Sequence, residues 1–131
     1  MKKIVILCLM LPCSVYAIDC NDAKTQKEMT ACAKIKNDKA DKELNKIYNY
    51  VMSHLDRPNM EKLKRTERVW VSYKETHCNA TAGLYDGGTM QEMIRYDCLT
   101  EVTKHRIINI ENTYREFLAN SEYDPDLKKT K

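Results

Sequence analysis

The chain has 131 residues, and its 22 basic and 19 acidic residues leave a formal net charge of +3. This length suits a single domain. Lys2 and Lys3 lie in a segment that we expect to be removed, and the mature chain would then carry a net charge of +1. A near-neutral chain with interleaved charges lacks the basic footprint of a nucleic-acid-binding protein, so nucleic acid is excluded as a partner.

Residues 1–17 have the pattern of a secretory signal peptide. A lysine pair at the start is followed by an apolar run and by a small-residue site that ends at Ala17. The run is too short to cross a bilayer, so we predict cleavage after Ala17 and no stable membrane insertion. A lipid anchor is the lesser alternative, because neither Cys13 nor Cys20 follows the small residue that lipidation signals prefer. The mature protein is therefore predicted to be periplasmic or secreted.

The first of three segments with helical periodicity begins at a capping signal. Thr25 and Glu28 have the spacing of a capping box, so a helix is predicted to start near Gln26 and to run for about 30 residues. Its apolar residues recur at spacings of three and four, as on one helix face. The predicted core stripe is Ala40, Leu44, Ile47, Val51 and Leu55.

A short break separates this helix from the second. Pro58 disfavours helical geometry in the residue before it, and Asn59 is the expected N-cap of the next helix. The second helix is predicted to fade after Cys78, and the Gly87-Gly88 pair closes the run. The apolar face predicted for this helix is Leu63, Trp70, Tyr73 and His77.

The third helix is predicted to run from about Met90 to Ala119. Thr89 and Glu92 form another capping-box pattern at its start. Ile108 lies opposite the main apolar side, so it is expected either to make a second contact or to be exposed. The main apolar side is predicted to consist of Leu99, Val102, Ile110, Tyr114 and Phe117.

The predicted fold class is all-α, because no segment has the period of a strand. Three amphipathic helices with short breaks predict an antiparallel three-helix bundle over residues 18–119. Residues 120–131 are charged and have almost no apolar side chains, so they are predicted to form a flexible tail.

Four cysteines remain after the predicted cleavage: Cys20, Cys32, Cys78 and Cys98. An even count in a small exported domain is typical of a disulfide framework. Three connectivities are possible. We favour Cys20–Cys32 with Cys78–Cys98 because each bond closes a short local loop, and each is expected to stabilise the fold by about 3 kcal/mol.

An ordered set of residues runs through nearly the whole mature chain. Its downstream part is Arg68-Val69-Trp70-Val71-x-Tyr73-Lys74-x-x-x-Cys78, Tyr85-Asp86-Gly87-Gly88-Thr89-Met90, Ile94-x-x-x-Cys98-Leu99-Thr100 and Arg106. Its upstream part is Cys20, Thr25-Gln26, Met29, Cys32, Ala40-Asp41, Leu44-Asn45 and Tyr48. The set resembles the LprI-like lysozyme-inhibitor family of small, exported, largely helical bacterial proteins. This resemblance implies that residues 18–119 form an LprI-like helical domain with a protein partner.

Arg106 falls within the apolar stripe of the third helix, between Val102 and Ile110. A buried arginine needs an acidic partner. We predict a structural ion pair with Asp41 that fixes the helix register; a contact with an anion or a protein partner is the functional alternative. The acidic candidates are Asp41, Glu67 and Glu101.

No metal, cofactor or catalytic site is predicted. The spacing of His77, Cys78, Cys98 and His105 is not that of a zinc site, and disulfide-bonded cysteines neither bind metal nor attack a substrate. Carboxylate pairs of the glycosidase type arise by chance among 19 acidic residues. No P-loop, nucleophile elbow or dinucleotide motif is present in the sequence. We therefore predict that the chain is not an enzyme.

The segment from Leu84 to Met90 is the predicted partner-binding surface. It combines aromatic, aliphatic and acidic side chains with glycines, and a neighbouring disulfide would hold it rigid, which lowers the entropic cost of binding. The alternative is a hairpin connection that only caps two helices. The predicted partner-binding residues are Tyr85, Asp86, Gly87, Gly88, Thr89 and Met90.

The function predicted from the resemblance is inhibition of a lysozyme-type muramidase by a loop that enters the substrate cleft and hydrogen-bonds the catalytic carboxylates. Tyr85, Thr89 and the amides of Gly87 and Gly88 are the expected donors. A net charge of +1 offers little electrostatic steering toward a basic lysozyme. The alternative is an immunity or envelope-stress protein that binds another secreted partner, such as a cell-wall amidase toxin. A structural envelope protein is a third hypothesis.

Overall fold

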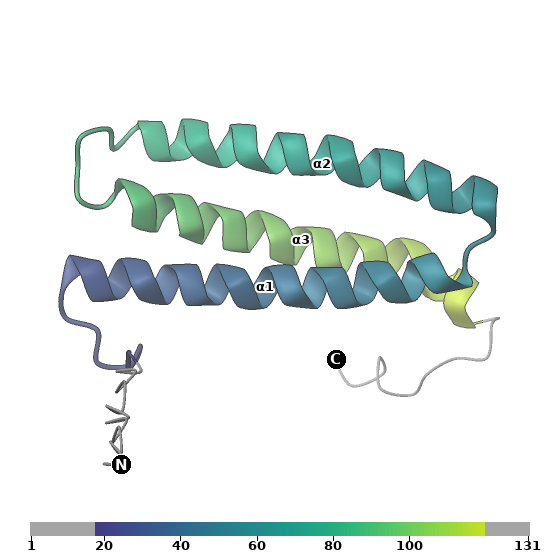
Figure 1. Cartoon of the computed structure of the whole chain (residues 1–131), viewed down its shortest axis with the longest axis horizontal. Helices are drawn as coiled ribbons and strands as arrows, with labels where there is room; N and C mark the ends of the chain where they lie inside the picture. Colours follow the sequence, from purple (N-terminus) through teal and green to yellow (C-terminus); the bar gives the residue numbers. More distant parts are fainter. Residues whose placement is uncertain (1–17, 120–131) are drawn as a thin grey trace, which may run out of the picture.

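The structure, a computed structural model, describes residues 18–119, which form three helices in antiparallel order (Figure 1). The helices are α1 (Gln26–His54), α2 (Arg57–Gly83) and α3 (Gln91–Ala119). No strand occurs in these residues, and the predicted all-α three-helix bundle is confirmed. The predicted signal peptide, residues 1–17, and the predicted tail, residues 120–131, lie outside the described residues.

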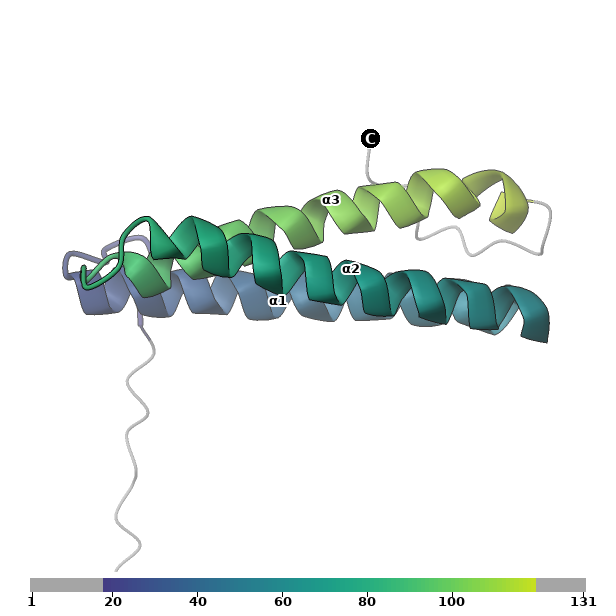
Figure 2. The same cartoon turned by 90° about the horizontal axis from the view of Figure 1, so that it is seen from above.

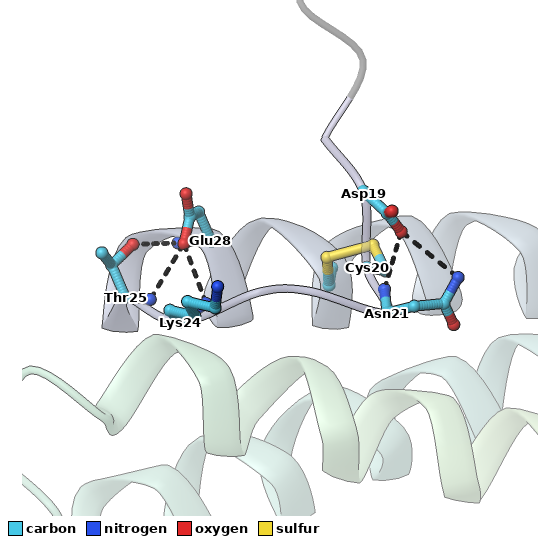
Figure 3. The surroundings of a disulfide bond; sticks show 7 residues. Asp19, Cys20, Asn21, Lys24, Thr25 and Glu28 are labelled. Carbon is cyan, nitrogen blue, oxygen red and sulfur yellow. Dashed lines mark hydrogen bonds between the residues drawn. A yellow bond between two sulfur atoms is a disulfide. The ribbon is translucent and has the colours of Figure 1, made fainter.

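The predicted capping box starts α1. The Thr25 hydroxyl accepts a hydrogen bond from the Glu28 amide at 3.2 Å, and the Glu28 carboxylate accepts one from the Thr25 amide at 2.9 Å. The Lys24 amide adds a third bond at 3.0 Å (Figure 3). The backbone bonds from Thr25 and then Lys24 lower the pKa of Glu28, because they favour its charged form.

The N-cap of α2 is Asp56, and the prediction of Asn59 for this role was wrong. The Asp56 carboxylate accepts a hydrogen bond from the Asn59 amide at 3.0 Å. Pro58 therefore lies in the first helical turn. Amides in this turn have no partner within the helix, so proline removes no helical hydrogen bond there.

The capping box predicted for α3 does not form. The Gln91 amide donates to the Gly88 carbonyl at 3.3 Å, so a backbone turn leads into the helix. Within the described residues, no hydrogen bond joins Thr89 to Glu92. The Asp86 carboxylate stabilises the turn instead by accepting a bond from the Gln91 side chain at 3.3 Å.

α1 and α2 both pack against α3, which lies above them in Figure 2. α1 and α2 approach each other much less closely than either approaches α3. The main apolar cluster extends from the middle of the bundle toward the end where α1 turns into α2. Its buried members are Leu44, Ile47, Val51, Leu63, Ile107, Ile110 and Leu118.

Two of the predicted apolar faces differ from the observed ones. Tyr73 is 55% exposed and stacks on exposed His77, with ring centroids 5.4 Å apart, so this pair lies on the surface. In α3, Leu118 is buried and Phe117 is exposed. Successive helical residues point about 100° apart, so a modest rotation of α3 decides which of the two is buried. Ile108 is exposed, which is one of its two expected outcomes.

Both predicted disulfides are present, and they lie toward the end of the bundle that carries the α2–α3 loop. Cys20–Cys32 ties the segment before α1 back onto that helix, with the Cα atoms 5.6 Å apart (Figure 3). Cys78–Cys98 joins α2 to α3, with the Cα atoms 5.5 Å apart. The favoured local connectivity is therefore confirmed, and each bond joins segments that are close in sequence.

Candidate functional site

A groove of about 540 Å³ runs between α1 and α2. It lies between the two helices that approach each other least. Its volume falls in the range of sites that hold small molecules. The lining residues are Asp41, Leu44, Asn45 and Tyr48 of α1, and Lys64, Glu67, Arg68, Trp70, Val71 and Lys74 of α2.

A buried lysine joins the two walls of this groove. The Lys74 ammonium lies 3.0 Å from Oδ1 of Asp41, and the lysine is only 8% exposed. The Asp41 carboxylate also accepts hydrogen bonds from the Thr103 hydroxyl at 3.4 Å and the Asn37 amide group at 3.3 Å. Donors from all three helices thus converge on one carboxylate, which offsets part of the cost of burying the charges.

A second ion pair joins α2 to α3. The Nε and Nη2 atoms of Arg106 donate to Oε2 of Glu67 at 3.1 and 2.9 Å. The prediction that Arg106 pairs with Asp41 was therefore wrong, because its observed partner is Glu67. Asp41 instead pairs with Lys74, whose burial the sequence did not predict. Glu67, the partner of Arg106, was one of the three acidic candidates named from the sequence.

Trp70 lies next to both of these cations. The Lys74 ammonium is 5.0 Å from the centre of the Trp70 ring, and the Arg106 guanidinium carbon is 5.8 Å from it. Both distances are within the range of cation–π attraction. Trp70 and Lys74 are four residues apart on one helix, and this spacing could have predicted the contact between them from the sequence.

Arg68 places an exposed positive charge at the groove. Its side chain is exposed and, within residues 18–119, forms no hydrogen bond or ion pair. Lys64, by contrast, pairs with Glu61 at 2.8 Å. Burial and then the charge of Glu67 raise the pKa of Tyr48, so its hydroxyl is protonated at neutral pH.

The α2–α3 loop, residues 84–90, exposes apolar side chains at the disulfide end. Leu84 is 82% exposed, and Tyr85 and Met90 are nearly half exposed. Gly87 has a φ of +73°, which favours glycine. The Gly88 amide donates to the Tyr85 carbonyl at 2.9 Å, and a Cβ at Gly88 would lie 3.0 Å from the same oxygen. The loop is thus a defined turn with glycines where the backbone needs them.

The predicted partner-binding residues lie together on this loop, but the two glycine amides do not have the role expected of them. The Gly87 amide donates to the Asp86 carboxylate at 3.1 Å, and the Gly88 amide is engaged by Tyr85. Neither amide is therefore free for a partner's carboxylate. The side chains of Tyr85 and Thr89 form no hydrogen bond with the described part of the chain, so both hydroxyls are available.

The family model described as "Lysozyme inhibitor LprI" matches residues 19–109. The chain belongs to the LprI family. The matched residues include the whole groove lining, the α2–α3 loop and both disulfides. The resemblance found in the sequence is therefore confirmed, and both candidate surfaces belong to the part of the chain that defines LprI proteins.

One relative is an uncharacterised protein of Rhizobium meliloti (strain 1021). It is 30% identical to this LprI family member in an alignment 101 residues long, and the match covers 67% of this chain and 73% of the relative. No solved structure matches the chain significantly. The association with lysozyme therefore comes from the family, and the relative adds no activity to it.

Three further properties of residues 18–119 bear on the site and its surroundings. Their helices lack the continuous apolar length that a bilayer crossing requires. Across the same residues, no three His, Cys, Asp or Glu side chains gather as metal ligands. Both disulfides are typical of proteins outside the cytoplasm.

Proposed function

We propose that this protein binds a lysozyme-type muramidase in the periplasm and inhibits it by placing the α2–α3 loop in the substrate cleft. Family membership over residues 19–109 is the observation that supports a lysozyme-type enzyme as the target. The exposed apolar side chains and ordered backbone of the loop support its role as the contact surface. The disulfides support a location outside the cytoplasm.

The mechanism is occlusion by a preformed loop. Muramidases cleave their substrate between two carboxyl groups. The Tyr85 ring is large enough to anchor the loop in a cleft, and the hydroxyls of Tyr85 and Thr89 can hydrogen-bond those carboxyl groups. Cys78–Cys98 holds the helices that flank the loop, so little conformational entropy is lost on binding. No chemical step is required of the inhibitor.

The balance of charge indicates how partners are selected. A mature chain with a net charge of +1 exerts little long-range attraction on a basic muramidase. Association then proceeds without electrostatic steering, and its rate depends weakly on ionic strength. Selectivity among muramidases must come from the fit of the loop.

An inhibition titration against muramidases of different surface charge tests the proposal. The mature protein is added to each enzyme, and lysis of a cell-wall suspension is followed by turbidity. We expect saturable one-to-one inhibition of at least one enzyme, with a direct binding measurement giving the same affinity. Failure to inhibit any enzyme, together with recovery of a cell-wall amidase from periplasmic extract, would favour the immunity hypothesis instead.

A further inference from the structure

The groove between α1 and α2 has no part in the loop mechanism, yet its charges are arranged to receive an anion. Its two carboxylates, on Asp41 and Glu67, are held in ion pairs by Lys74 and Arg106. Arg68 is exposed and forms no hydrogen bond or ion pair within residues 18–119. A guanidinium offers several N–H donors in a planar fork, which suits a carboxylate.

The other lining residues indicate what carries that anion. The Asn45 amide and the Tyr48 hydroxyl supply hydrogen-bonding groups, while Leu44 and Val71 supply apolar surface. A sugar ring presents hydroxyls and C–H surface in a similar alternation. An amphipathic helix would instead need a continuous apolar stripe, and the charged pairs of the groove interrupt any such stripe.

We propose that the groove between α1 and α2 binds an acidic saccharide, with Arg68 holding its carboxylate and Asn45 and Tyr48 holding its hydroxyls. The volume of about 540 Å³ is within the range of small-ligand sites. The expected sugar is a carboxylate-bearing amino sugar of the cell wall. That identity rests on the proposed action against muramidases, whereas the anion site rests on the groove alone.

Trp70 provides a direct measurement of binding. It lines the groove and is the single tryptophan of the chain, so its fluorescence reports on this site. The probes are N-acetylmuramic acid and N-acetylglucosamine, which lacks the lactyl carboxylate. We expect a saturable change in Trp70 fluorescence with the acid, and binding of the neutral sugar weaker by about tenfold or more, the factor that loss of one charged contact represents.

Arg68→Gln tests the anchor, with Arg65→Gln as its matched control on the same helix. Arg65 is exposed and lies outside the groove lining. Arg68→Gln should remove the preference for the acid, whereas Arg65→Gln should leave it unchanged, with equal melting temperatures for the two variants. Equal affinity of the wild-type protein for both sugars, equal effects of both substitutions, or tighter binding of an acidic tripeptide would overturn the proposal.

The same variants separate this inference from the proposed function. Arg68→Gln should leave muramidase inhibition by the loop intact, and Tyr85→Ala should leave binding of N-acetylmuramic acid intact. Full inhibition by Tyr85→Ala, with its sugar binding unchanged, would count against the loop mechanism only. Loss of sugar discrimination in Tyr85→Ala would overturn the assignment of the sugar to the groove.

Discussion

The end of the bundle where α1 turns into α2 is closed by an apolar cluster of seven buried residues, whereas the end that carries the α2–α3 loop is closed by two disulfides. Near the disulfides the buried side chains include those of Ala33 and Ala82. Alanine buries little apolar area and so contributes little to stability. The disulfides contribute there by restricting the unfolded chain.

The two ends therefore differ in role: one provides most of the apolar stabilisation, and the other carries the proposed binding loop. Large apolar side chains stabilise one end, and the proposed contact loop extends from the other, where covalent bonds hold the backbone. Between the two ends, the Asp41–Lys74 and Glu67–Arg106 pairs link α2 to α1 and to α3. Reduction of the disulfides should therefore lower the stability of the whole domain and the rigidity of the loop, while the packing of the apolar cluster should persist.

Ile110→Ala probes the apolar end and should have the largest effect. Ile110 is 1% exposed, so its truncation leaves a cavity and should lower the free energy of unfolding by about 4 kcal/mol. Ile108→Ala is the matched control, because Ile108 is 53% exposed, and it should change that free energy by less than about 0.5 kcal/mol. Chemical denaturation followed by circular dichroism measures both. Similar losses in the two variants would contradict the assigned core.

Replacing Cys78 and Cys98 together by serine probes the loop end. The two residues are 20 apart in sequence, so the unfolded chain regains entropy and stability should fall by about 3 kcal/mol. Inhibition should weaken as well, because the loop loses its anchor. Replacing Cys20 and Cys32 should cost less, since that bond closes a shorter loop and leaves the helices joined. If the variant lacking Cys78 and Cys98 melts and inhibits like the wild-type protein, packing alone holds the loop end of the bundle together.

Arg106→Ala probes the polar layer between the ends. It leaves the Glu67 carboxylate without its partner, and the expected loss of stability is about 2 kcal/mol. This is less than for a fully buried pair, because the two side chains are 14% and 17% exposed. A cycle with Glu67→Gln should show non-additive losses. Arg115→Ala is the control, since Arg115 bonds only Asn112 among residues 18–119. Additivity in the Arg106–Glu67 cycle would argue against a coupled pair.

Tyr85→Ala should have the smallest effect on stability and a selective effect on binding. Tyr85 is 44% exposed, so melting should hardly change, while affinity for the muramidase should fall by about 2 kcal/mol, or about 30-fold. Tyr73→Ala is the control, because Tyr73 is also exposed but lies on α2. If Tyr85→Ala unfolds the protein while inhibition per folded molecule persists, Tyr85 is structural and the contact lies elsewhere.

Features with local causes could be predicted from the sequence. The Thr25–Glu28 capping box and the two disulfides depend on residues that are close along the chain. The N-cap of α2 was misplaced, because Asp56 and Asn59 are both good capping residues. Only the observed hydrogen bond distinguishes them.

The pairing of Arg106 required three-dimensional information. Asp41 and Glu67 were both plausible partners from the sequence, and they lie on different helices. The rotation of α3 and the burial of Lys74 decide the outcome: Lys74 engages Asp41, and Arg106 binds Glu67. Neither the helical period nor the charge pattern of the sequence predicts how far α3 is rotated about its axis.

The sequence by itself determined the helices, their order, the local disulfides and membership of the LprI family, because each depends on short-range spacing or on an ordered set of residues. Only the tertiary structure decided that α1 and α2 separate to form a groove and that Arg68, exposed there, forms no hydrogen bond or ion pair within residues 18–119. Both results depend on how far each helix lies from the others, and that distance is set by the packing of all three helices together.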